Sequence, residues 1–121
     1  MKRNQFQALD VATQAATACI ELAHNIRKPF GDVVSQLTRA ALSIPLNLTE
    51  GAGRTGKARK NFYRIAYGST RESMEIVEIL LKLRLVDPKQ ANKCLNLLDR
   101  VGAMCWRFSS CPSDTRNHLS C

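Results

Sequence analysis

The spacing of apolar residues constrains the fold of this chain more than any other feature. Four successive segments, 5–27, 32–51, 57–86 and 88–109, each carry an apolar stripe in which residues recur every three or four positions. This spacing is typical of one buried face on an α-helix. The stripes comprise Leu9, Ala12, Ala16, Cys19, Ala23 and Ile26; Val34, Leu37, Ala41, Ile44 and Leu48; Phe62, Ala66, Ser69, Ser73, Ile76, Leu80 and Leu83; and Ala91, Leu95, Leu98, Val101, Cys105 and Phe108. We therefore predict four helices and an all-α fold.

The breaks between these segments contain residues that end or begin helices. Lys28-Pro29-Phe30-Gly31 follows the first segment, and we expect Asp32 to cap the second helix. Gly51, Gly53 and Gly56 separate the second segment from the third. In Asp87-Pro88-Lys89-Gln90, the aspartate is an N-cap, the proline occupies the first helical position, and Gln90 completes a capping box.

Short connections between long helices favour antiparallel neighbours. We predict an up-down-up-down four-helix bundle over residues 1–109, with residues 110–121 as a flexible C-terminal tail. Pro45 lies inside the second apolar stripe and removes one helical hydrogen bond. Because the stripe continues through Leu48, we expect a kink there and not the end of the helix.

The composition excludes several classes of protein. No apolar run approaches the roughly 18 residues that indicate a transmembrane helix, and the first ten residues lack the apolar core of a signal peptide. The five cysteines are an odd number, which is typical of reduced thiols in a cytoplasmic protein. We expect a cytoplasmic protein that does not enter the membrane.

Positive charge is concentrated in one part of the chain. The net charge is +8, and residues 51–71 contain six basic residues and no acidic one. These are Arg54, Lys57, Arg59, Lys60, Arg64 and Arg71. On a helical wheel, Lys57, Lys60, Arg64 and Arg71 fall within about 60° on the side away from the core stripe, flanked by Tyr63 and Tyr67.

A surface of outward cations beside aromatic rings suits phosphate neutralisation and base stacking. We predict that the six basic residues bind RNA or DNA by backbone and shape, without sequence specificity. Two alternatives remain open. The cations could pair with Glu72, Glu75 and Glu78 of a neighbouring subunit, or they could form an ordinary solvated face.

Two further stripes are not explained by the predicted core. On the third helix, a second apolar stripe lies roughly 100–120° from the first and comprises Tyr63, Tyr67, Met74, Val77, Leu81 and Leu85. We predict that it is an oligomer interface, with a wide core face as the alternative. On the second helix, a polar stripe comprises Gln36, Arg39, Ser43, Asn47 and Glu50, and is either a solvated face or a hydrogen-bonded contact.

No combination of residues indicates catalysis. Neither His24 nor His118 has a carboxylate or cysteine at a useful helical spacing, and no nucleophile is paired with a base. Cys111, His118 and Cys121 do not have the spacing of a common zinc site, and the glycine-rich segment 51–56 lacks the ending of a P-loop. We expect no enzyme, no metal and no cofactor, with a metal- or cofactor-binding bundle as a distant alternative.

Residues 35–54 read SQLTRAALSIPLNLTEGAGR. This segment resembles the core motif of the bacterial four-helix-bundle proteins related to those encoded in 23S rRNA intervening sequences, S-Q-x-x-R-A-x-x-S-I-P-x-N-x-x-E-G-x-G-R. Ile65 to Ser69 and Glu72 also match, and the resemblance covers roughly residues 6–105. It implies an up-down-up-down bundle that assembles into a ring-like homopentamer, and it supplies no catalytic residues.

A more distant relative is the accessory variability protein of diversity-generating retroelements, a basic pentameric bundle that binds reverse transcriptase and nucleic acid. This resemblance implies an alternative function for the chain, as a protein-interaction scaffold or adaptor such as an accessory factor for a reverse transcriptase. Of these two functions, the basic and aromatic residues of the third segment favour nucleic-acid binding.

Overall fold

The computed structural model describes residues 1–26 and 30–110. They form four α-helices: α1 (Arg3–His24), α2 (Gly31–Ala52), α3 (Gly56–Lys82) and α4 (Pro88–Ser110). The described residues contain no β-strand, so the all-α prediction and all four helices are confirmed. The tail prediction and Cys111, His118 and Cys121 lie outside the described residues.

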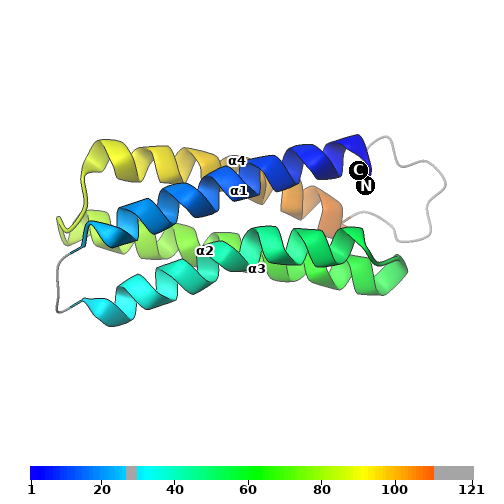
Figure 1. Cartoon of the computed structure of the whole chain (residues 1–121), viewed down its shortest axis with the longest axis horizontal. Coiled ribbons are helices and arrows are strands. Elements are labelled where there is room, and N and C mark those ends of the chain that lie inside the picture. The colour runs from blue at the N-terminus through cyan, green and yellow to red at the C-terminus, as the bar shows by residue number, and fades with distance from the viewer. Residues whose placement is uncertain (27–29, 111–121) are drawn as a thin grey trace.

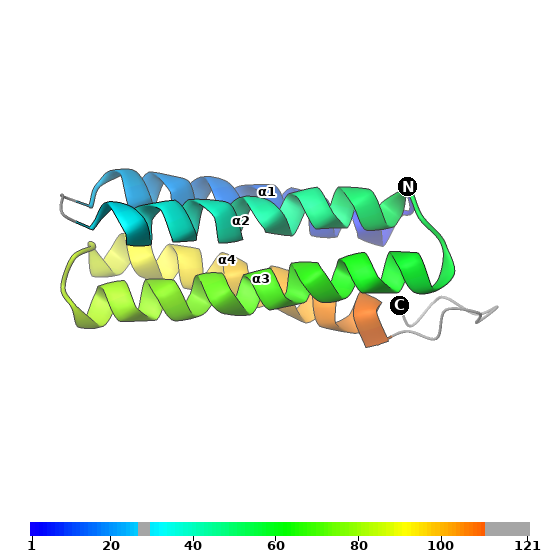
Figure 2. The same ribbon diagram turned by 90° about the horizontal axis from the view of Figure 1, so that it is seen from below.

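The four helices lie side by side along the long axis of the molecule (Figure 1). The last residues of α1 and α3 and the first residues of α2 and α4 lie at one end of the molecule, and the α2–α3 connection lies at the other, so successive helices are antiparallel (Figure 2). Each helix packs on two neighbours, through the pairs α1–α2, α2–α3, α3–α4 and α1–α4. This arrangement is the predicted up-down-up-down bundle, with α1 diagonally opposite α3.

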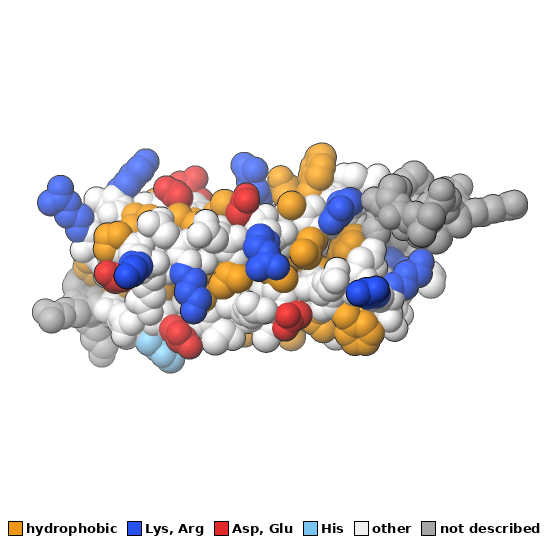
Figure 3. All heavy atoms as spheres, turned by 90° about the horizontal axis from the view of Figure 1, so that it is seen from above, with side chains coloured by type: hydrophobic (Ala, Val, Ile, Leu, Met, Phe, Trp, Pro, Cys, Tyr) orange, Lys and Arg blue, Asp and Glu red, His pale blue; other side chains and the backbone are white. Residues whose placement is uncertain are grey.

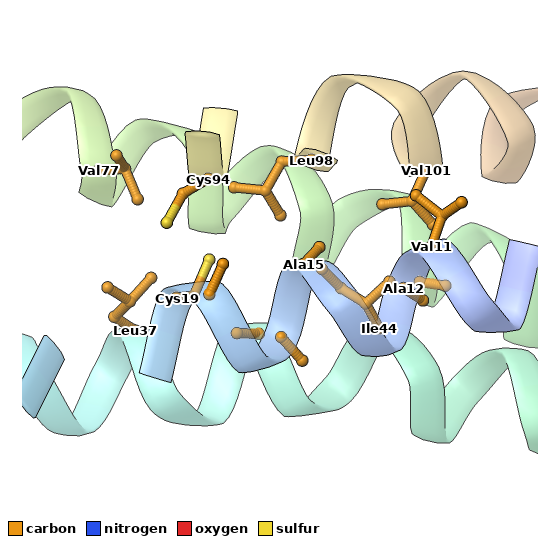
Figure 4. Packing of buried hydrophobic residues seen from close by; sticks show 14 of the residues in the cluster. Val11, Ala12, Ala15, Cys19, Leu37, Ile44, Val77, Cys94, Leu98 and Val101 are labelled. Atoms are coloured by element: carbon orange, nitrogen blue, oxygen red, sulfur yellow. The ribbon is translucent and has the colours of Figure 1, made fainter. Parts of the chain in front are cut away.

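Small residues bring α1 close to its neighbours. Six of its nine buried residues are alanines, and the other three are Val11, Cys19 and Leu22. Side chains from α2, α3 and α4, among them Ile44, Val77 and Leu98, fill the centre of the bundle (Figure 4). Burying such side chains contributes about 1.5–3 kcal/mol each, which makes this core the main source of stability.

The buried face of α3 lies between its two predicted apolar stripes. Its buried residues are Tyr63, Ala66, Thr70, Ser73, Ile76, Val77 and Leu80. Phe62 and Ser69 of the predicted core stripe are half-buried. Leu83 was predicted in the core, but it follows the last residue of the helix and is 56% exposed. The core face of α3 is therefore wider and rotated relative to the prediction.

The start of α4 agrees in part with the prediction from the sequence. The Asp87 carboxylate accepts a hydrogen bond from the Gln90 backbone N–H at 3.0 Å, and α4 begins at Pro88, which confirms the predicted cap. The Gln90 side-chain oxygen accepts a hydrogen bond from the Asn25 amide at 3.4 Å, and its part in the capping box stays a prediction. This contact joins the end of α1 to the start of α4.

The N-cap of the second helix lies two residues earlier than predicted. Its N-cap is Phe30, and Asp32 lies inside the first turn, where its charge still favours the helix N-terminus. The helix continues through Pro45 to Ala52, so the proline does not end it. In the part of the chain that the structure describes, no helix combines the length and apolar character needed to cross a membrane.

Candidate nucleic-acid surface

Four cations lie on the outer side of α3, and we call them the basic stripe: Lys57, Lys60, Arg64 and Arg71. Lys57, Arg64 and Arg71 are exposed, and Lys60 is half-buried. Among the described residues, none of the four forms an ion pair. Their positive charge is therefore directed to solvent without an acidic partner in this part of the chain.

Arg59 was predicted to bind nucleic acid, but it faces the end of α2. Its Nε donates a hydrogen bond to the Gly51 carbonyl at 3.2 Å, and its Nη2 donates to the Ala52 carbonyl at 3.3 Å. Carbonyls in the last turn of a helix lack intrahelical partners, and a cation there also interacts favourably with the helix dipole. Arg59 therefore caps α2, and it is not counted in the basic stripe.

Arg54 is exposed and has two partners of its own. Its Nη2 pairs with Glu50 at 3.3 Å, and its guanidinium carbon lies 5.4 Å from the centre of the Phe62 ring. The carboxylate neutralises part of its charge. An exposed pair of this kind is weak, so Arg54 retains the capacity to meet a phosphate at the edge of the basic stripe.

Two of the predicted interface residues belong to the core of their own chain. Tyr63 is 3% exposed, its hydroxyl accepts a hydrogen bond from Gln5 at 2.8 Å, and its ring lies 5.2 Å from that of Phe108. Burial raises the pKa of the Tyr63 phenol, although the nearby Arg59 charge opposes this effect. Val77 is fully buried. Tyr63 and Val77 therefore belong to the wide core face that was the alternative to an oligomer interface.

The other members of that stripe lie at the margin of the core. Tyr67, Met74, Leu81 and Leu85 are half-buried and pack against the core cluster. Because these four side chains are partly exposed, they could contact another subunit, and their role in an oligomer interface stays a prediction.

The polar stripe of α2 has two parts. Ser43 and Asn47 are half-buried in the seam between α2 and α3. The Ser69 hydroxyl donates to the Ser43 hydroxyl at 2.8 Å, and the Asn47 amide donates to the carbonyl and the hydroxyl of Ser43, each at 2.8 Å. Gln36, Arg39 and Glu50 are exposed. The stripe thus joins two helices of one chain at its centre and faces solvent on either side.

The structure also reveals surface features that the sequence reasoning missed. Five large apolar side chains are 41–62% exposed on or just after α2 and α3: Leu42, Leu46, Ile65, Ile79 and Leu83. Trp106 on α4 is 58% exposed. Leu42 and Leu46 are one turn apart and off the core stripe, a spacing that could have indicated a second apolar face on α2.

A second line of cations lies on α4. Lys89, Lys93, Arg100 and Arg107 are exposed and fall within about 40° on the helical wheel. Acidic residues outside residues 51–71 nearly balance the basic ones, so the net charge of that part of the chain gives no sign of this line. On the side formed by α1 and α4, Lys and Arg are spread along the molecule with Asp and Glu among them (Figure 3).

Possible metal ligands do not gather in the described ranges. No group of three or more His, Cys, Asp or Glu side chains there could hold a metal ion. His24 is exposed at the last turn of α1.

Comparison with known proteins agrees with this architecture. The model of the 23S rRNA-intervening sequence protein family matches residues 4–107. The chain belongs to this family. No curated protein matches it. A crystal structure of a protein of unknown function from the S23 ribosomal protein family of Bacteroides thetaiotaomicron is similar, with a TM-score of 0.79 and 16% identity, over 89% of this chain and 99% of that one. At this identity, the similarity shows the shared bundle fold.

Proposed function

We propose that this protein is a non-enzymatic, cytoplasmic, oligomeric four-helix bundle that binds RNA or DNA without sequence specificity through the basic stripe of α3. The observation that carries the proposal is the set of four outward cations without an ion pair among the described residues. Cations of this kind displace the counterions of a phosphate backbone, which provides affinity without reading the bases. The family description, which names intervening sequences of 23S rRNA, favours structured RNA as the first ligand to test.

The test is binding of a structured RNA and a duplex DNA across a salt series, measured by fluorescence anisotropy. We expect the affinity to fall steeply with salt, and the triple variant Lys57→Glu/Lys60→Glu/Arg64→Glu to lose most of it. The matched control is Lys89→Glu/Lys93→Glu/Arg100→Glu, which changes the net charge equally on α4. Equal losses in both variants would mean that only net charge matters, and no loss in the α3 variant would overturn the proposal.

We also propose that the chain forms a homo-oligomer, and the resemblance supports a five-subunit ring. The exposed apolar residues of α2 and α3 favour these two helices as the subunit contact, since large apolar side chains exposed to water can mark an interaction surface. Light scattering should give a mass above that of one chain, and Leu46→Glu/Ile65→Glu should reduce it. Met74→Glu tests the interface predicted from the second apolar stripe, with circular dichroism to check folding.

The same measurements separate the alternatives. If the basic stripe pairs with Glu72, Glu75 and Glu78 of a neighbour, the α3 charge reversal will dissociate the oligomer. A monomeric wild-type protein would contradict the oligomer proposal. The exposed apolar face would then favour the adaptor function, for a reverse transcriptase or another protein partner.

A further inference from the structure

A shallow hollow of about 330 Å³ lies between α3 and α4. It is lined by Tyr67, Thr70, Arg71, Met74, Asp99, Gly102, Ala103 and Trp106. The wall of the hollow on the α4 side is low because Gly102 has no side chain and Ala103 has only a methyl group. A Cβ on Gly102 would lie 3.1 Å from Thr70 Cγ2, so the two helices are in close contact at the floor of the hollow.

One wall of the hollow is aromatic. The centres of the Tyr67 and Trp106 rings are 5.4 Å apart, with their planes inclined at 51°. Trp106 nevertheless remains 58% exposed, so much of the indole surface has no partner within the described residues. Because the two rings already touch, a flat ligand would stack on the outer face of the indole and not between the rings.

The same hollow is bordered by positive charge. Arg71 lines it and donates a long hydrogen bond, 3.5 Å, to the Tyr67 hydroxyl. Lys60 and Arg64 lie within about 60° of Tyr67 on the α3 wheel, along the edge that faces α4. Asp99 is the one carboxylate among the lining residues. Arg71 and Asp99 balance each other within the lining, and the excess of positive charge comes from Lys60 and Arg64 beside the hollow. An open aromatic face next to these cations suits a ligand that is both flat and anionic.

We propose that an unpaired nucleobase of single-stranded RNA or DNA stacks on Trp106, while the adjoining phosphates lie along Lys60, Arg64 and Arg71. This inference rests on the proposed nucleic-acid function and adds a binding site on α4 to it. Aromatic side chains bind single strands in this way regardless of base identity, because every base has a π-face, and nearby cations hold the backbone. A duplex, whose bases are already stacked, would contact only the basic stripe.

Trp106 is the only tryptophan of the chain, so its fluorescence reports on this hollow directly. The first experiment titrates the protein with an oligothymidylate of about 12 nucleotides, within the range of single-strand site sizes. We expect quenching that follows the binding curve measured by anisotropy. An abasic strand of equal length should bind the basic stripe without quenching, and thymidine monophosphate should not quench at these concentrations. Equal quenching by the mononucleotide would overturn the assignment to a strand.

Variants then separate stacking from folding. We expect Trp106→Ala to weaken binding of the single strand by roughly 10-fold or more, as base–aromatic stacking predicts, and to leave duplex binding unchanged. Trp106→Phe, which keeps a ring, should retain most of the affinity. Phe6→Ala is the matched control, because Phe6 on α1 is also 58% exposed. Circular dichroism checks that each variant is folded.

The outcomes distinguish this inference from the proposed function. If the strand binds without quenching, or if Trp106→Ala binds it as well as the wild type, the stacking site is wrong while the basic stripe stands. If neither single strand nor duplex binds, both proposals fail.

Discussion

Arg59 and Lys60 are neighbours in the chain but have different surroundings. Arg59 caps α2 through two backbone carbonyls, whereas Lys60 lies in the basic stripe. We expect Arg59→Ala to lower the free energy of unfolding by about 1–2 kcal/mol, because charged hydrogen bonds to the end of a helix are lost. Lys60→Ala should leave stability nearly unchanged.

The two variants should also differ in nucleic-acid binding. Lys60→Ala should reduce the slope of log affinity against log salt by about one, as expected for one lost phosphate contact, and Arg59→Ala should not. Urea unfolding and a salt titration of both proteins check this pair of expectations. The assignment of Arg59 fails if its alanine variant is as stable as the wild type and has the smaller salt slope.

Gly51 allows α2 and α3 to approach each other closely. A Cβ at this position would lie 2.6 Å from Tyr63 Cε1, and the Tyr63 ring is held by Gln5 and Phe108. We expect Gly51→Ala to destabilise the fold by about 1–3 kcal/mol, the usual cost of overpacking. Gly68→Ala is the control, because a Cβ there meets no atom within 4 Å.

The two glycine variants should shift stability in opposite directions. Alanine is favoured over glycine inside an exposed helix, so Gly68→Ala should stabilise by about 0.5–1 kcal/mol. Thermal unfolding of the two proteins measures both effects. A Gly51→Ala protein as stable as Gly68→Ala would show that Tyr63 has room to move.

At the scale of the element, the start of α4 depends on one side chain. Asp87 holds the Gln90 backbone N–H, and Pro88 follows at the first helical position. We expect Asp87→Ala to cost about 1 kcal/mol, the typical value of an N-cap. Asp87→Ser should recover most of it, because its hydroxyl can accept the same bond. Chemical denaturation of the three proteins is the measurement, and equal stabilities would mean that the cap contributes nothing.

At the scale of the whole molecule, burial of thiols should lower the free energy of unfolding at alkaline pH. Burial raises the pKa of Cys105 to about 12. Cys19 and Cys94 face each other from α1 and α4 (Figure 4), and the hydrogen bond between them raises the pKa of Cys19 and lowers that of Cys94, so their shifts oppose each other. An unfolded thiol titrates near 8.5, so the unfolded chain loses the Cys105 proton first as the pH rises.

The folded state is therefore penalised on the alkaline side. The contribution of Cys105 is fully present below about pH 8.5 and is lost as the pH rises toward 12, at up to about 1.4 kcal/mol per pH unit. We expect the free energy of unfolding to fall between pH 8 and pH 10.5, and to fall less in Cys105→Ala. Urea unfolding at the two pH values measures the difference. An identical pH dependence in the variant would contradict this origin.

Much of the fold could be predicted because its signals are local. Apolar periodicity identified the four helices, and Asp87-Pro88 located the start of α4 to the residue. The outward direction of Lys57, Arg64 and Arg71 also follows from the wheel of a single helix. Each of these features depends on residues within a few turns of one another, so the sequence contains the relevant interactions.

Packing between helices decided the features of the fold and of the candidate site that the sequence left open. Two apolar stripes on α3 left its core face undetermined, and contacts with α2 and α4 placed Tyr63 and Val77 inside and Leu83 outside. The same contacts turned Arg59 toward the end of α2 and brought Trp106 beside Tyr67. The sequence by itself determined which segments are helices and that Lys57, Arg64 and Arg71 face outward, because helical periodicity is a property of each segment alone. Only the tertiary structure decided the rotation of each helix, because that depends on how side chains from different helices share one interior.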